Sequence, residues 1–191
     1  MFDKESDVVT IVDRDRTLET PRLLLEPLVP SHAAILYEPL RVAHLYTFIP
    51  QEPPASRESL ERRYMALSTR RSPDGHDIWL NWALRRRDTD AYVGLMQATV
   101  HADHTAMLAY MVFVVSQRQG YAVESAVRVL THLFDDYQVS VVAAEIDTRN
   151  GPSIRLVEAL GFVRVAIVPD ADSFKGTTSD EYRYELRSDM R

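Results

Sequence analysis

Apolar side chains along the chain follow two spacings, one typical of strands and one typical of helices. Stretches of closely spaced apolar and β-branched residues predict strands at residues 21–28, 78–86, 92–100 and 106–115. Short helices are expected at residues 31–37 and after Ser56, where Leu60, Tyr64 and Leu67 recur on one helical face. Polar turns separate the last three strands, so we predict an antiparallel meander.

After residue 115 the pattern becomes an alternation of helices and strands. Apolar residues at helical spacing predict a long helix over residues 122–134. The later predicted elements are a strand at 139–146, a helix at 150–160 closed by Gly161, a strand at 162–168, a loose loop, and a strand at 181–186. Antiparallel strands followed by a β-α-β-α-β region predict a mixed α/β sheet.

Length and composition point to one globular domain. The chain has 191 residues, of which 46% are hydrophobic and 26% charged, which is typical of a protein that buries a core and excludes whole-chain disorder. Residues 1–17 carry mixed charges around a short apolar patch. We therefore expect an N-terminal extension, 1–17, followed by a single domain, 18–191.

Charge and cysteine content exclude several function classes. The absence of cysteine excludes a disulfide, a thiolate zinc site and a cysteine nucleophile. A net charge of −6 disfavours nucleic acid as a partner, because phosphate backbones need a basic face. The apolar run 106–115 is about half the roughly 20 residues of a membrane-spanning helix, so no membrane partner is expected. Because the first seven residues are too acidic for a secretory signal, we expect a cytoplasmic protein.

The loop before the long helix is the first candidate for chemistry. It reads Gln117-Arg118-Gln119-Gly120-Tyr121-Ala122. Free backbone N–H groups and the positive end of the helix dipole meet at such a position, which suits an anionic diphosphate. The same residues could instead form only a tight turn with a packing alanine, so the loop alone leaves both readings open.

A second motif changes the interpretation of the first. About thirty residues further on, Asn150 and Ser153 open the next helix, which ends at Gly161-Phe162. Strand, Q-x-x-G-x-A, helix, strand, N-x-x-S, helix and G-F, in this order, resemble the GNAT superfamily of acyl-CoA-dependent N-acyltransferases. Thr20–Leu25 and Asp180–Tyr184 look like the first and last strands of the branch that contains the ribosomal-protein N-terminal acetyltransferases.

The resemblance covers residues 18–187 and implies both a fold and a reaction. The implied fold is a single GNAT-type α/β domain: a mixed, mostly antiparallel sheet of about seven strands, helices on both faces, and a split between two central parallel strands. The implied reaction transfers an acetyl group from acetyl-CoA to a primary amine, on a protein N-terminus or a small molecule, directly in a ternary complex. A monomer or homodimer without a metal is expected.

The resemblance also assigns residues to the cofactor. The amides of the loop Gln117–Ala122, with Gln119, Gly120 and Ala122 foremost, would hold the diphosphate of coenzyme A. The main chains of Val112, Phe113 and Val114 would pair with the pantetheine arm. Asn150 and Ser153 would lie near the pantetheine and thioester, although Asn and Ser at a helix start are also ordinary caps.

Departures from the family pattern leave the proton transfers open. Val157 stands where the relatives often have a tyrosine acid, and Met107 and Ala143 stand where glutamates are common. We consider Glu145 first, as a base acting through a water, and then Tyr110 or Ser153 as hydroxyl donors. Each has a structural alternative: a paired surface carboxylate, a core tyrosine and a helix cap.

The sequence leaves a second function open and disfavours a third. The same departures are compatible with a silent module that binds acyl-CoA as a sensor or scaffold. A nucleotide-binding protein is disfavoured, because the sequence contains neither G-x-x-x-x-G-K-[ST] nor G-x-G-x-x-G. His101 and His104 have no further ligand cluster around them in the sequence, so no metal site is predicted.

Overall fold

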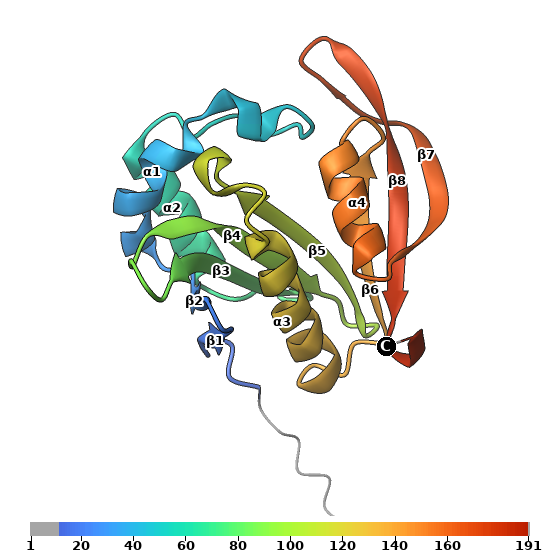
Figure 1. Cartoon of the computed structure of the whole chain (residues 1–191), viewed down its shortest axis with the longest axis horizontal. Helices are drawn as coiled ribbons and strands as arrows, with labels where there is room; N and C mark the ends of the chain where they lie inside the picture. The colour runs from blue at the N-terminus through green and yellow to red at the C-terminus, as the bar shows by residue number, and fades with distance from the viewer. Residues whose placement is uncertain (1–11, 191) are drawn as a thin grey trace, which may run out of the picture.

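A computed structural model describes residues 12–190, so part of the expected N-terminal extension, residues 1–11, lies outside it. The described chain forms a sheet of eight strands in the order β1-β2-β3-β4-β5-β6-β8-β7 (Figure 1). The strands are β1 Leu18–Glu19, β2 Leu23–Pro27, β3 Ile78–Arg86, β4 Tyr92–Val100, β5 Thr105–Val112, β6 Val141–Asp147, β7 Val163–Phe174 and β8 Thr177–Arg187. The α-helices are α1 Ala33–Leu40, α2 Arg57–Leu67, α3 Tyr121–Asp135 and α4 Gly151–Ala159. Short 3₁₀ helices lie at Pro30–His32, Ala43–Tyr46, Val114–Ser116 and Ser188–Met190.

The N-terminal strands form the predicted antiparallel meander. β3 and β4 have the bounds expected from the sequence, and β2 to β5 pair antiparallel in chain order. Gly94 of β4 faces Val112 of β5, and a Cβ at Gly94 would lie 2.3 Å from the carbonyl oxygen of Met111. Only glycine permits so close an approach of the two backbones.

β5 and β6 are the parallel pair, and they separate soon after they meet. Their register covers only Thr105–Met107 against Val141–Ala143. Beyond these residues the strands diverge, and α3 and α4 flank the opening (Figure 1). The predicted mixed sheet with a split between its central parallel strands is therefore confirmed.

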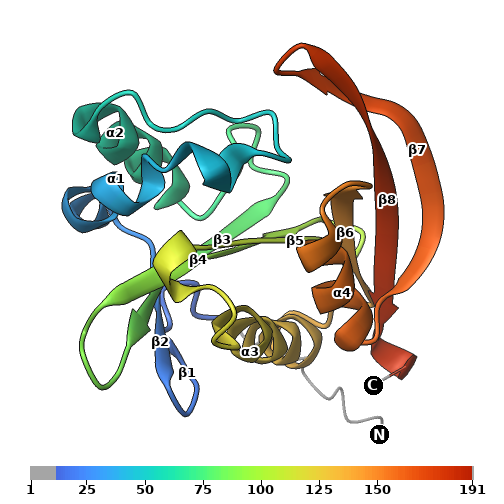
Figure 2. The ribbon, with the colours of Figure 1, turned by 45° about the horizontal axis from the view of Figure 1, so that its top comes forward.

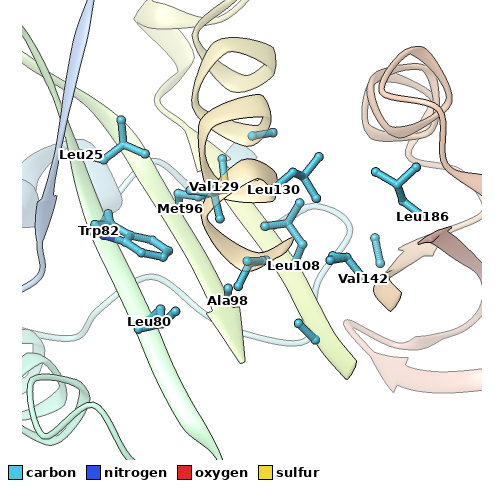
Figure 3. Packing of buried hydrophobic residues seen from close by; sticks show 14 of the residues in the cluster. Leu25, Leu80, Trp82, Met96, Ala98, Leu108, Val129, Leu130, Val142 and Leu186 are labelled. Carbon is cyan, nitrogen blue, oxygen red and sulfur yellow. The ribbon is translucent and has the colours of Figure 1, made fainter. Parts of the chain in front are cut away.

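Helices cover both faces of the sheet, as predicted. α3 and α4 lie on one side of the strands, and α1 and α2 lie on the other side (Figure 2). Val129 and Leu130 of α3 pack over Met96 and Leu108 (Figure 3). Val129 is 0% exposed, and full burial of such a side chain contributes about 1.5–3 kcal/mol. This packing fixes the start of α3 relative to β5.

α2 begins where the sequence indicates. The Ser56 hydroxyl accepts a hydrogen bond from the Ser59 amide at 3.1 Å, which is the expected cap. The helix places Leu60 and Tyr64 against the sheet. In the described part of the chain, no helix is long and apolar enough to cross a membrane.

The C-terminal strands differ from the prediction. Residues 169–179, expected to form a loose loop, belong to a long β7–β8 hairpin with Lys175 and Gly176 at its turn, both at positive φ. The part of β7 that the prediction left out, residues 169–174, reads Pro-Asp-Ala-Asp-Ser-Phe, so it lacks the β-branched residues and the alternation that predict a strand. At the hairpin tip, the Lys175 ammonium donates to the carbonyl oxygens of Tyr46 and Ile49.

Candidate active site

The loop before α3 presents free main-chain donors. Gly120, with φ of 82°, is the N-cap of α3, and Arg118, with φ of 59°, is also left-handed. Within residues 12–190, no group accepts a hydrogen bond from the amides of Gln119–Ala122. These amides lie at the N-terminus of a 15-residue helix, where the helix dipole favours a negative charge. The residues therefore fit a diphosphate group.

Arg22 and Glu124 hold this loop, and neither was among the site residues expected from the sequence. The Arg22 guanidinium donates to Glu124 from Nε at 2.6 Å and to the Gln119 carbonyl from Nη1 at 2.9 Å. Glu124 also accepts hydrogen bonds from the Arg22 amide and the Thr20 hydroxyl. The only sequence signal was the Thr20–Leu25 motif, which predicts a strand and not this contact.

Electrostatics keep the Arg22–Glu124 pair charged. Burial by itself would raise the pKa of Glu124, but the hydrogen bonds from Thr20 and Arg22 lower it below its ordinary value. The Arg22 guanidinium carbon lies 4.8 Å from the centre of the Tyr121 ring. A fixed positive charge is thus held beside the free amides of the loop.

The open edge of β5 differs from the expectation in its residues. β5 ends at Val112, and Phe113 uses both main-chain groups internally: its amide donates to Val93 O and its carbonyl accepts from the Ser116 amide. The pairing expected of Phe113 therefore has no free group. Val114 lies in a 3₁₀ helix, and its carbonyl accepts from the Gln117 amide.

Strand alternation identifies which residues face the split instead. The main-chain groups of Phe113 point toward β4. Because this direction alternates along a strand, the main-chain groups of Leu108, Tyr110 and Val112 point the other way, toward the split. Gln117 already satisfies the Val112 carbonyl through its side-chain amide at 3.1 Å. The pairing of Met107 with Ala143 uses the Leu108 amide. The Leu108 carbonyl, the Tyr110 main chain and the Val112 amide thus form the strand edge that no neighbouring strand covers.

Asn150 and Ser153 lie at the start of α4. The Asn150 side chain accepts from the Ser153 amide at 3.3 Å, so it is a helix cap. The Ser153 carbonyl accepts from the Tyr110 hydroxyl at 3.4 Å. Tyr110 therefore spans the opening between β5 and α4, and burial raises the pKa of its phenol.

The candidate base Glu145 is exposed on β6. Its carboxylate lies 3.3 Å from the Arg183 guanidinium, and 39% of its side chain is exposed. Glu181 lies on the same face of the sheet, paired in register with Asp147. Burial raises the pKa of Glu181, and neighbouring carboxylates, that of Asp147 among them, raise it further. Val157 is fully buried in the core, so it leaves no place for an acid on that turn of α4.

A cavity of about 290 Å³ opens on the α1–α2 side of β4 and β5. Its lining includes Tyr110, whose hydroxyl donates to the Ser153 carbonyl of α4. Its walls are formed by Leu40, Tyr46, Ile49, Gln51, Glu52, Pro54, Ser59, Leu60, Arg63, Tyr64, Leu95, Gln97, Ala109, Tyr110 and Met111. No group of three or more His, Asp or Glu residues in the described chain is arranged to hold a metal ion.

Comparisons with known proteins agree with this geometry. The model of the acetyltransferase (GNAT) domain family matches residues 22–163. A Bacillus subtilis protein named uncharacterized N-acetyltransferase YoaA is 23% identical over 171 residues, covering 88% of this chain and 95% of that protein.

Solved structures show the same fold. A GCN5-related N-acetyltransferase from Brucella melitensis superposes with a TM-score of 0.78 at 20% identity, covering 92% of this chain and 80% of that one. A Vibrio cholerae spermidine N-acetyltransferase in complex with CoA and spermine superposes with a TM-score of 0.76 at 16% identity, covering 90% of this chain and 98% of that one. The fold and the match to the family model together show that this chain belongs to the GNAT acetyltransferase family.

Proposed function

We propose that the protein transfers an acetyl group from acetyl-CoA to a primary amine by direct attack in a ternary complex. The free amides of Gln119–Ala122, beside an unpaired strand edge on β5, carry this proposal. The chain has no cysteine to form an acyl-enzyme. A complex that holds both substrates at once is therefore the consistent route.

The cofactor supplies an activated acetyl group as a thioester, and the protein binds and orients it. The loop amides and the Arg22 guanidinium would neutralise the diphosphate. The Leu108 carbonyl, the Tyr110 main chain and the Val112 amide would pair with the amides of the pantetheine arm, as a neighbouring strand would. The same strand edge offers N–H donors to negative charge that develops on the acyl oxygen.

Two side chains are suited to hold the protons of the reaction. Tyr110 has a raised pKa and lies where β5 faces α4, so its phenol stays protonated at neutral pH and can donate to a leaving thiolate. Glu181 has a raised pKa on the sheet face that also carries Glu145, and we assign it the role of accepting a proton from the amine. The Arg183 pairing of Glu145 favours a structural role for that residue.

Two measurements on the purified protein test the proposal. Calorimetry with coenzyme A measures cofactor binding, and thiol release from acetyl-CoA with a panel of amines measures turnover. Binding together with release of one thiol per acetylated amine, identified by mass, supports the proposal. Tight binding without thiol release on any acceptor would instead identify a sensor module.

A further inference from the structure

The cavity beside β5 combines apolar walls with two opposite charges. Leu40, Leu60 and Leu95 form part of its wall, and Glu52 and Arg63 also line it. Glu52 and Arg63 are exposed, and neither makes a hydrogen bond or ion pair within residues 12–190. Opposite charges on one apolar cavity match a ligand that carries both an ammonium and an anionic group around an apolar body.

Arg63 is the positive charge of this cavity. It lines the cavity, and its exposed side chain makes no hydrogen bond or ion pair within residues 12–190. A guanidinium without an acceptor of its own suits a carboxylate.

The β7–β8 hairpin limits the size of the ligand. Lys175 at its tip is bonded to the carbonyls of Tyr46 and Ile49, and both of these residues line the cavity. This contact joins the outer wall of the cavity to the far side of the cleft (Figure 2). A volume of about 290 Å³ lies at the lower end of the range for small-molecule sites. A protein N-terminus would have to displace the contact made by Lys175.

We propose, on the basis of the proposed acetyl transfer, that the acceptor is a small zwitterion: an apolar α-amino acid or a close derivative. Its carboxylate binds Arg63, its apolar side chain packs on Leu60 and Leu95, and its amine points to β5. The amine nitrogen forms a bond to the acyl carbon and the C–S bond breaks. One amine proton ends on the thiol, so the products are an N-acetyl amino acid and coenzyme A.

A matched pair of acceptors tests the carboxylate. L-Phenylalanine and phenethylamine share one apolar body, and only the first has a carboxylate. We expect kcat/KM for phenylalanine to exceed that for phenethylamine at least tenfold. Arg63→Ala should abolish this preference. Arg62→Ala, which removes a neighbouring charge outside the cavity, should leave it unchanged.

Assays with other acceptors distinguish the zwitterion proposal from the proposed acetyl transfer itself. Higher kcat/KM for spermidine or for a peptide with N-terminal serine than for any apolar amino acid would overturn the zwitterion proposal and leave acetyl transfer intact. An unchanged ratio of kcat/KM for phenylalanine to kcat/KM for phenethylamine in Arg63→Ala would also overturn the zwitterion proposal and leave acetyl transfer intact. Failure of the protein to bind coenzyme A would overturn the proposed function itself.

Discussion

Arg22 and Glu124 are 102 residues apart in the sequence, yet the Arg22 Nε atom lies 2.6 Å from a carboxylate oxygen of Glu124. The pair joins the start of β2 to the first turn of α3. It also places the Arg22 guanidinium against the Gln119 carbonyl. Because Arg22 contacts both the first turn of α3 and the loop of free amides, its loss should affect the stability of the fold and the affinity of the loop for an anion.

Removing Arg22 should weaken cofactor binding. In Arg22→Ala, the loop loses its contact at Gln119 and Glu124 becomes an unpaired negative charge beside the diphosphate. We expect the Kd for coenzyme A to rise at least tenfold, which corresponds to about 1.4 kcal/mol. Calorimetry measures the effect, and Arg128→Ala on the same helix is the control. Adding Glu124→Gln should restore part of the affinity, because it removes the repulsion; no restoration would contradict this account.

Gly120 should be required for its backbone conformation. Alanine at φ of 82° is strained by about 1–2 kcal/mol, and its Cβ would lie 3.2 Å from Arg22 Nη2. Gly120→Ala should therefore lower the melting temperature and raise the Kd for coenzyme A. Gly75→Ala has the same kind of strain at φ of 76°, with open space around the added atom. Gly75→Ala should therefore lower the melting temperature and leave the Kd for coenzyme A unchanged. Equal increases of this Kd in Gly120→Ala and Gly75→Ala would argue against the loop as the anion site.

Tyr110→Phe should slow the reaction without affecting the cofactor. Because burial raises the pKa of this phenol, the parent protein keeps the proton across neutral and mildly alkaline pH. Its kcat should show no loss from this group up to about pH 9. The variant should lose at least tenfold in kcat, a modest share of the 10²–10⁴-fold typical of general acids. An unchanged kcat at saturating substrates would exclude Tyr110 as the proton donor.

Glu181 should control the acidic side of the rate profile. A base must be deprotonated, and burial raises the pKa of Glu181, so kcat/KM should fall as the pH drops through a value above 4.5. Glu181→Gln should lower the rate and remove this limb, whereas Glu145→Gln should leave it in place. The folded state disfavours the ionised form of Glu181, so its ionisation costs stability once the pH exceeds the unfolded pKa. Urea unfolding should accordingly find Glu181→Gln more stable than the parent at pH 7.

The sequence predicts well those elements that are rich in buried apolar residues and end at polar turns. β3 and β4 match their expected bounds because both faces of each strand contribute to a core cluster, which gives a dense apolar run between polar turns. The Ser56 cap and α2 follow from local chemistry. β7 was predicted only as far as Val168, because residues 169–174 are mostly polar and begin with proline.

The candidate site also has parts that the sequence predicts and parts that it does not. The loop of free amides was predicted from Gln117 to Ala122, because a glycine before an apolar helix has a local signature. The contact between Arg22 and Glu124 depends on two distant segments that only the folded sheet brings together. Whether the main-chain groups of Phe113 point toward β4 or toward the split depends on how β4 and β5 pair, and side-chain types do not determine this.

The short pairing of β5 with β6 leaves the two halves of the molecule joined by few main-chain contacts. The pairing at Thr105–Met107 is one attachment, and the tip of the β7–β8 hairpin provides a second through Lys175. A ligand bonded along the open edge of β5 would add main-chain contacts between these halves. Saturation with cofactor should therefore slow amide deuterium exchange at Tyr110 far more than within β3, because the occupied cleft opens less often.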